Sequence, residues 1–190
     1  MVDFKNLVVK DRSYRRFYEN EKIGKREMLK LIDCARLTAS GQNHQGMRYR
    51  LVCSEKECEK LFATLAWAAL YKEWEGPKKG QRPAAYILCV RDKSVNKNLT
   101  FDDGIVASTI TLAAAANGIG SCILQNCQYQ KAFEALGIDP ERYAFSCVIA
   151  LGHPSEKVVL EEMKDDQTNY WKTSDDVHHV PKRRLEDILL

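Results

Sequence analysis

The most informative stretch of this 190-residue sequence runs from Asp103 to Leu124 and reads DGIVASTITLAAAANGIGSCIL. Its first half is apolar or small on every side, which predicts a buried helix over residues 103–117. Asn117-Gly118 then stops the helix, and residues 119–124 predict a strand. The apolar part from Ile105 to Ala116 is twelve residues long. Because a membrane span needs about 20 apolar residues, we expect a core helix and no membrane span.

Helices and strands are expected on both sides of this stretch. The apolar spacing predicts helices over residues 3–10, 25–37, 55–71 and 129–136, and strands over residues 48–53, 85–90 and 144–151. This mixture predicts an α+β fold with helices and one sheet packed as two layers. Trp67, Tyr71 and Trp74 are spaced as neighbours on the predicted helix and its following loop. Such a row of aromatics is more often core than substrate lid.

The character of the chain changes after residue 155. Residues 1–155 contain no repeat, linker or low-complexity tract, which predicts a single domain. Residues 156–190 are mostly polar and charged, yet they end in the apolar segment LEDILL. Too little apolar surface is available there for independent folding. We therefore expect an extended C-terminal tail that wraps its own domain or reaches a partner subunit.

Composition excludes several classes of protein. The chain has 29 basic and 26 acidic residues and a net charge of +3, too balanced for a dedicated nucleic-acid binder. Seven cysteines occur without a CxxC pair, and the N-terminus lacks the apolar core of a signal peptide. We interpret the cysteines as buried thiols of a cytoplasmic protein. The four histidines show no ligand spacing, so no metal site is expected.

Two basic clusters and one amide-rich loop are the candidates for chemistry. Residues 10–17 read KDRSYRRF and residues 181–184 read PKRR, and clustered cations with a hydroxyl suit a phosphate. A solvated basic face is the competing interpretation. Residues 37–45 read LTASGQNHQ, and their amides could meet the edge of a heteroaromatic ring. An ordinary helix-to-strand loop uses the same residue types.

No catalytic residue is evident. The chain contains no G-x-S-x-G elbow, no H-E-x-x-H sequence and no P-loop. The glycines at 118 and 120 follow a helix and open a strand, the reverse of the Rossmann order. Difficult chemistry would therefore fall to a cofactor.

Taken in order, six segments of the chain resemble the flavin-dependent nitroreductase family. They are Asp11–Phe17, Ala39–Met47, Asp103-Gly104, Gly118–Cys122, Leu151–Pro154 and Val180–Leu185. The resemblance implies a nitroreductase-like α+β fold with a mainly antiparallel central sheet flanked by helices. It also implies a C-terminal tail exchanged in a homodimer, and FMN held at the dimer interface.

The resemblance also implies which residues bind the cofactor. Arg12, Ser13 and Arg15 match the phosphate and ribityl contacts, and Lys182 with Arg183 or Arg184 would close over the same phosphate. Ala39, Ser40, Gly41 and Asn43 would reach the flavin from the partner subunit. Leu124 and Gln125 match the place where the family has backbone donors beside the flavin N5.

Three departures from the family pattern affect these contacts. Asp11 replaces the usual first arginine and could instead hold Arg15 or Arg16 in place. Ala39 and Gly46-Met47 replace prolines and a tryptophan, which leaves the ring-side loop less rigid. Gln125 stands where the family uses other residues.

The leading hypothesis from the sequence is an FMN-dependent oxidoreductase that uses NADH or NADPH. By resemblance it would alternate between the nicotinamide and a small aromatic acceptor such as a nitroaromatic or quinone, in a ping-pong cycle. The alternative is a flavin-binding storage or sensing module without nitroreductase turnover. A nucleic-acid-binding protein is a third possibility, against which the small net charge argues.

Overall fold

The computed structural model describes residues 3–71, 73–95 and 101–190 and is built around one antiparallel sheet. Its strands lie in the order β1-β2-β4-β3, and every neighbouring pair is antiparallel. The strands are β1 (Met47–Val52), β2 (Ala85–Asp92), β3 (Gly120–Leu124) and β4 (Tyr143–Gly152). The predicted α+β fold with a mainly antiparallel sheet is confirmed.

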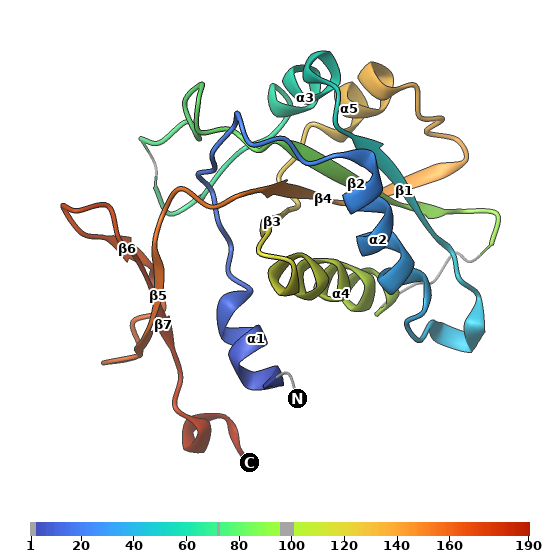
Figure 1. The fold of residues 1–190 in the computed structure, drawn as a ribbon. Helices are drawn as coiled ribbons and strands as arrows, with labels where there is room; N and C mark the ends of the chain where they lie inside the picture. Colours follow the sequence, from blue (N-terminus) through green and yellow to red (C-terminus); the bar gives the residue numbers. More distant parts are fainter. Residues whose placement is uncertain (1–2, 72, 96–100) are drawn as a thin grey trace.

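Helices cover both faces of this sheet, so the domain has three layers rather than the predicted two (Figure 1). One face carries α2 (Lys25–Arg36) and α4 (Asp102–Ala116), and the other carries α3 (Glu55–Phe62) and α5 (Tyr129–Leu136). Successive side chains of a strand point to opposite faces, so β2 sends Ile87 into one core and Leu88 into the other. The near-continuous apolar sequences of β2 and β4 are typical of strands buried on both faces.

The helix predicted over residues 55–71 is wrong beyond Phe62, where α3 ends. The Thr64 hydroxyl donates to the Leu61 carbonyl at 2.7 Å, and the Ala66 N–H donates to the Asn126 carbonyl at 3.0 Å. Ala68 then adopts a positive φ of 39°. Because tertiary hydrogen bonds replace helical ones there, the aromatic residues lie on a loop. The other predicted helices and strands are found within two residues of their expected limits.

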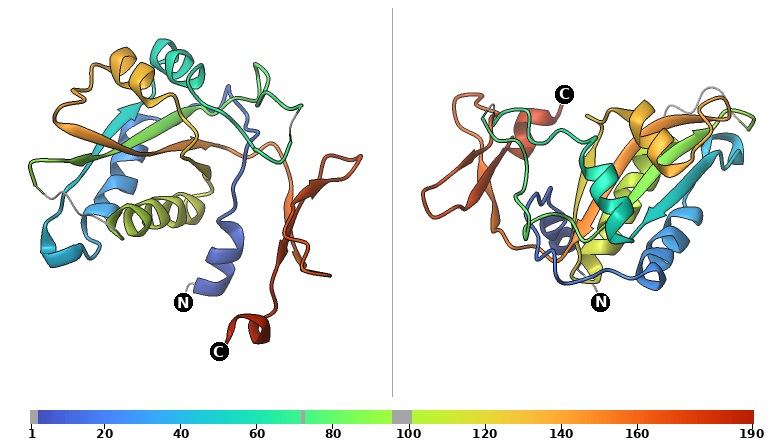
Figure 2. Two further views of the ribbon diagram at one scale, coloured as in Figure 1. Left: turned by 180° about the vertical axis from the view of Figure 1, so that it is seen from behind. Right: turned by 90° about the horizontal axis from the view of Figure 1, so that it is seen from above.

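α4 is apolar on all sides but buried on only one of them. Val106, Ile110 and Ala114 lie in the core against the sheet. Ile105 on the outer side is 36% exposed, and Phe101 just before the helix is 77% exposed. α1 (Phe4–Lys10) has no buried residue and lies between α4 and the tail (Figure 2). This end of the molecule therefore presents an apolar surface to solvent.

The chain that follows α1 runs along the edge of the sheet and is packed tightly there. Ser13 forms a β-bridge with Ser121 of β3, and the Tyr14 N–H donates to the Ser121 carbonyl at 2.9 Å. Phe17 is completely buried, and its ring lies over Gly152 at the end of β4. A Cβ at residue 152 would stand only 2.7 Å from the Phe17 ring, so this contact requires glycine.

The C-terminal tail contains a small sheet of its own and is less extended than predicted. Its strands are β5 (Val158–Glu162), β6 (Trp171–Lys172) and β7 (His178–Lys182). β7 lies in the middle, parallel to β5 and antiparallel to β6. This sheet stands beside the main domain rather than on either face of its sheet (Figure 2). Packing of the tail on a partner subunit stays a prediction.

The cysteines are less uniformly buried than expected. Only the strand residues Cys89, Cys122 and Cys147 are buried, whereas Cys34 and Cys53 are exposed. The two exposed thiols lie in α2 and just after β1, where one side of the element faces solvent. Within the described part of the chain, no helix combines the length and the apolar character that a membrane crossing requires.

Candidate functional site

The N-terminal basic cluster, Arg12 to Arg16, contains unsatisfied buried donors. Arg12 donates through Nη2 to the Val8 carbonyl at 2.8 Å, which ties it to the last turn of α1. The Nε atoms of Arg12, Arg15 and Arg16 are all buried and have no hydrogen-bond partner among the described residues. Unpaired buried donors are costly. An anion such as a phosphate would satisfy them, so this cluster fits such a group.

Arg15 and Arg16 differ in how their charges are balanced. Arg16 forms an ion pair with Asp176 of the tail. Arg15 instead donates through Nη1 to the Ser13 carbonyl at 3.2 Å, and its guanidinium lies 5.0 Å from the centre of the Tyr170 ring. Within the described residues, no carboxylate forms an ion pair with Arg15. Its charge is therefore available to a ligand.

Asp11 does not hold Arg15 or Arg16, contrary to the expectation from sequence. Its carboxylate accepts a hydrogen bond from the Thr111 hydroxyl of α4 at 2.7 Å. Burial raises the pKa of Asp11, and the hydrogen bond from Thr111 and the charge of Arg12 partly oppose that rise. Asp11 thus fastens the basic cluster to α4, and the arginines find their partners in the tail.

The amide-rich loop is held by a carboxylate that sequence reasoning missed. Asp102, the first residue of α4, is buried and accepts from the Ser40 hydroxyl at 2.6 Å and from the Gly41 N–H at 3.0 Å. Ser40 Oγ in turn accepts from the Gln45 N–H at 2.9 Å. The signal available in the sequence was the pair of acidic residues at the start of α4, which could accept hydrogen bonds from a polar loop. Ser40 and Gly41 are therefore positioned by Asp102, and their donors are used within the chain.

The same loop has an unusual backbone and borders a cavity. Gln42, Asn43 and Gln45 have positive φ angles of 50°, 57° and 52°, a backbone conformation that residues other than glycine adopt only rarely. Ala39 and Ser40 line a cavity of about 180 Å³ between α2, β1 and α4. The hydrogen bonds to Asp102 hold this loop in place of the family's prolines.

The remaining predicted contacts lie at the far end of β3 and in the tail. Leu124 is buried and ends β3, and Gln125 follows it on the surface. Lys182 ends β7, Arg183 pairs with Asp166 at 2.7 Å, and Arg184 pairs with Asp187 at 3.0 Å. Both arginines are thus paired with acidic residues of the tail itself. Their convergence on one phosphate stays a prediction.

α4 separates the two groups of predicted contacts. The Ser40 loop is attached at its first residue, whereas Ser13 pairs with Ser121, beyond its last residue. Asp11, at the start of the basic cluster, contacts Thr111, which lies nine residues along α4 from Asp102, or about 13.5 Å at 1.5 Å per residue. A single chain therefore does not bring the amide-rich loop and the basic cluster together.

Sequence reasoning also missed His178, which lies at the centre of a buried polar cluster. Its Nδ1 lies 2.8 Å from the Tyr71 hydroxyl, and its Nε2 lies 3.3 Å from Nη1 of Arg15. Burial, helped by the positive charge of Arg15, lowers the pKa of His178 to about 4. No spacing in the sequence indicated this cluster, because its members come from residues 15, 71, 170 and 178.

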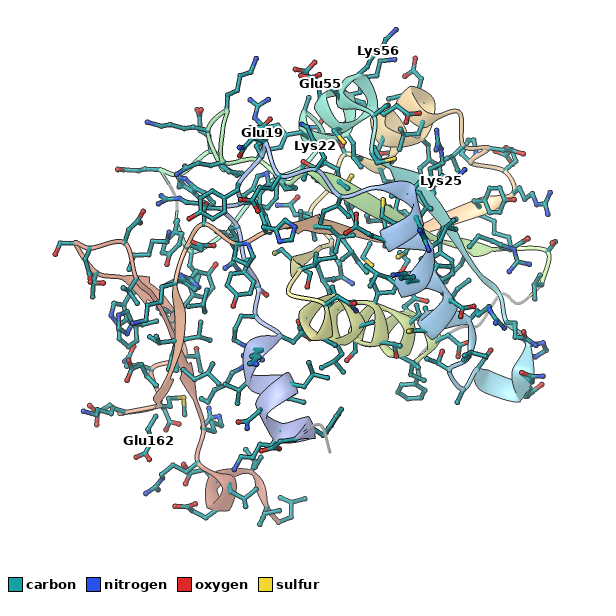
Figure 3. All side chains as sticks on the ribbon, in the orientation of Figure 1. Glu19, Lys22, Lys25, Glu55, Lys56 and Glu162 are labelled. Carbon is teal, nitrogen blue, oxygen red and sulfur yellow. The ribbon has the colours of Figure 1, made fainter. Side chains whose placement is uncertain are left out.

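A second cavity, on the other side of the sheet, is too small for a large ligand. It is lined by Glu19, Lys22 and Glu55, which gather near the start of α3 (Figure 3), and by two cysteines. Its volume is about 50 Å³, which leaves room for only a few water molecules. The described residues contain no group of three or more histidine, cysteine or acidic side chains arranged to hold a metal.

Comparison with known proteins identifies the family. The family model described as "Nitroreductase family" matches residues 9–153, most of the chain. This chain belongs to the nitroreductase family. The matched range contains the basic cluster, the amide-rich loop and β3, whereas the tail residues Lys182, Arg183 and Arg184 lie outside it.

Solved structures share the fold over most or all of the chain. A putative nitroreductase in complex with FMN from Desulfovibrio desulfuricans is 21% identical in sequence and has a TM-score of 0.72. The superposition covers 100% of this chain and 96% of that one. Another putative nitroreductase in complex with FMN, from Exiguobacterium sibiricum, is 20% identical and has a TM-score of 0.68. The superposition covers 90% of this chain and 98% of that one. CLA-ER, an enone reductase of gut-bacterial fatty acid saturation metabolism, is 19% identical and has a TM-score of 0.70. The superposition covers 87% of this chain and 95% of that one. Among curated proteins there is no match.

Proposed function

We propose that this nitroreductase-family chain is an FMN-dependent oxidoreductase that uses NADH or NADPH. The observation that carries the proposal is the set of three buried guanidinium N–H groups, in the segment that resembles the family's phosphate-binding motif, that have no hydrogen-bond partner among the described residues. The FMN complexes of the D. desulfuricans and E. sibiricum proteins, which share the fold, support the choice of cofactor.

The chain's own residues would bind and orient the cofactor rather than react. Arg12 and Arg15 would neutralise the phosphate, with Ser13 between them as a hydroxyl partner. Leu124 and Gln125 would face the ring from the end of β3, and the tail cations would close over the phosphate. FMN, when bound, supplies the hydride and electron transfer for which the chain has no side chain of its own.

The proposed cycle is of ping-pong type. The reduced nicotinamide and an aromatic acceptor such as a nitroaromatic or a quinone would occupy the same place in turn, and the bound flavin would supply the electron transfer that links the two half-reactions. Solvent would supply protons, because no acid–base side chain is assigned here.

The first test is the absorption spectrum of the purified chain with added FMN. We expect a yellow, stoichiometric complex that NADH or NADPH bleaches under anaerobic conditions and that nitroaromatics or quinones restore. Riboflavin and FAD serve as ligand controls. Protein that stays colourless after incubation with FMN would contradict the proposal.

A flavin-binding storage or sensing module is the second candidate function. Asp11 and Gln125 favour it, because both depart from the family pattern at the flavin and Asp11 is engaged by Thr111. This candidate predicts bound flavin without steady-state NAD(P)H oxidation. Turnover with any of several acceptors would eliminate it.

We also propose that the functional unit is a homodimer. The exposed apolar side of α4, with Phe101 and Ile105, is the kind of surface that association covers. A partner chain could also bring its amide-rich loop to the basic cluster, which a single chain does not do.

Replacing Ile105 by lysine is expected to give monomers, because a buried unpaired charge is costly in an interface. Light scattering after size-exclusion chromatography would measure the mass, and circular dichroism would confirm the fold. Tyr18→Lys, at a similarly exposed side chain away from α4, is the matched control and should remain dimeric. Dimers that persist in I105K would show that α4 is not the interface.

A further inference from the structure

We propose that His178 is a positioning residue that holds the Arg15 guanidinium in place for a flavin phosphate while leaving its charge unneutralised. The inference rests on the proposed function, because it assigns Arg15 to the phosphate. It adds a residue from the tail that neither motif resemblance nor the family match covers, since the match ends at residue 153.

The hydrogen bonds fix the state of the imidazole. Arginine can only donate, so the 3.3 Å contact with Nη1 of Arg15 makes Nε2 of His178 an acceptor. The proton of the neutral ring then sits on Nδ1 and is donated to the Tyr71 hydroxyl, 2.8 Å away. Tyr71 thereby selects the tautomer whose free nitrogen faces Arg15.

Packing holds the imidazole rigidly. His178 is only 2% exposed, and its ring centre lies 5.0 Å from that of Tyr170 and 5.9 Å from that of Tyr71. Tyr170 also stacks on the Arg15 guanidinium, with 5.0 Å between the ring centre and Cζ. Arg15 is thus confined by a ring nitrogen, an aromatic face and the Ser13 carbonyl.

All three groups that confine Arg15 are neutral. The nearest acid, Glu156, accepts from the backbone N–H groups of Arg15 and Arg16 and from Lys172 Nζ at 3.0 Å. Its carboxylate therefore serves the backbone and the lysine instead of the Arg15 side chain. A carboxylate at residue 178 would hold Arg15 equally well but would cancel the charge that a phosphate needs.

Protonation of His178 would reverse its role. A proton on Nε2 would place an N–H against Nη1 of Arg15, and the two cations would repel each other. The charged and titratable groups around the ring are Arg15, Lys172, Glu156, His179, Tyr71 and Tyr170. Burial and the cations Arg15, Lys172 and His179 lower the pKa of His178, with Glu156 opposing, so the ring is neutral near neutral pH.

The experiment compares FMN with riboflavin, which lacks the phosphate, by fluorescence titration of the full chain. We expect wild-type protein to prefer FMN. His178→Leu is expected to weaken FMN binding about tenfold or more, because that is the usual cost of losing a hydrogen bond to a charged group. The riboflavin affinity of this variant should stay within about twofold of wild type. His178→Gln, which keeps a neutral acceptor, should restore most of the preference.

Two further measurements separate positioning from general packing. In an Arg15→Gln background, H178L should cause no additional loss, because the two residues act through one contact. On acidification from pH 6 to 4, the FMN preference of wild type should fall more than that of H178Q, which has no titratable ring. This pH comparison needs only wild type and H178Q, so it stands even if H178L does not fold.

The outcomes distinguish the two proposals. Wild-type protein that binds neither flavin, or binds both equally, overturns the phosphate role of the basic cluster and with it the proposed function. Wild type that prefers FMN, with an H178L variant that keeps this preference, overturns only the positioning role. Identical pH profiles for wild type and H178Q overturn it as well.

Discussion

Gly152→Ala is expected to lower the free energy of unfolding by about 2 kcal/mol, in the range that overpacked cores show. The new methyl group would lie 2.7 Å from Cδ1 and 2.8 Å from Cβ of Phe17, far inside contact distance. Phe17 is fully buried and bridged to Pro154, so it has little room to move. For a chain of this size, about 2 kcal/mol corresponds to a fall of about 4–8 °C in Tm.

Thermal unfolding followed by circular dichroism measures this change. Gly24→Ala is the matched control, because a Cβ there meets nothing closer than 3.5 Å, and only the N-cap preference for glycine over alanine, about 1 kcal/mol or less, should lower its Tm. Shrinking the opposing ring with Phe17→Leu should recover part of the loss in a G152A background. An unchanged Tm for G152A would mean that Phe17 can move away from residue 152 at little cost.

Arg15→Gln is expected to weaken FMN binding about 10- to 100-fold, the usual cost of losing a charged hydrogen-bond donor. Glutamine keeps much of the side-chain length but removes the cation, which is the part a phosphate recognises. Fluorescence titration with FMN and with riboflavin measures the loss, which should fall on FMN alone.

Arg26→Gln removes the same charge from an exposed position on α2 and is the matched control. Its FMN affinity should stay within about twofold of wild type, because long-range surface charge is screened by salt. Equal losses in R15Q and R26Q would indicate a general charge effect and would remove Arg15 from the site.

The local elements were predictable because their signals are local. α4 and β3 follow from one apolar run and its glycine stop, and α5 ends at Gly137 in the left-handed conformation that favours glycine. The helical periodicity of residues 63–71 led to a wrong prediction, because Leu65 pairs with Cys127 in a β-bridge. No local sequence pattern indicates this pairing. The number of layers was also misjudged, although the two-sided burial of β2 and β4 was visible as continuous apolar sequence.

Only those parts of the candidate site that lie within a single segment of the chain could be predicted from the sequence. The basic cluster and the amide-rich loop were found as motifs, and the family match covers both. Asp102 and His178 were missed because their partners, Ser40 and Arg15, lie 62 and 163 residues away in the chain. Contacts at such separations depend on the finished fold, and no periodicity encodes them.

The length of α4 has a consequence for genetics and for mixing experiments. In the proposed dimer, each site would draw the basic cluster from one chain and the amide-rich loop from the other, because α4 holds these two segments apart within a single chain. A chain damaged in its basic cluster and a chain damaged in its amide-rich loop would therefore complement each other. Their mixed dimer would contain one site with both defects and one site with neither, so each mixed dimer would recover half of the wild-type activity from two inactive parents.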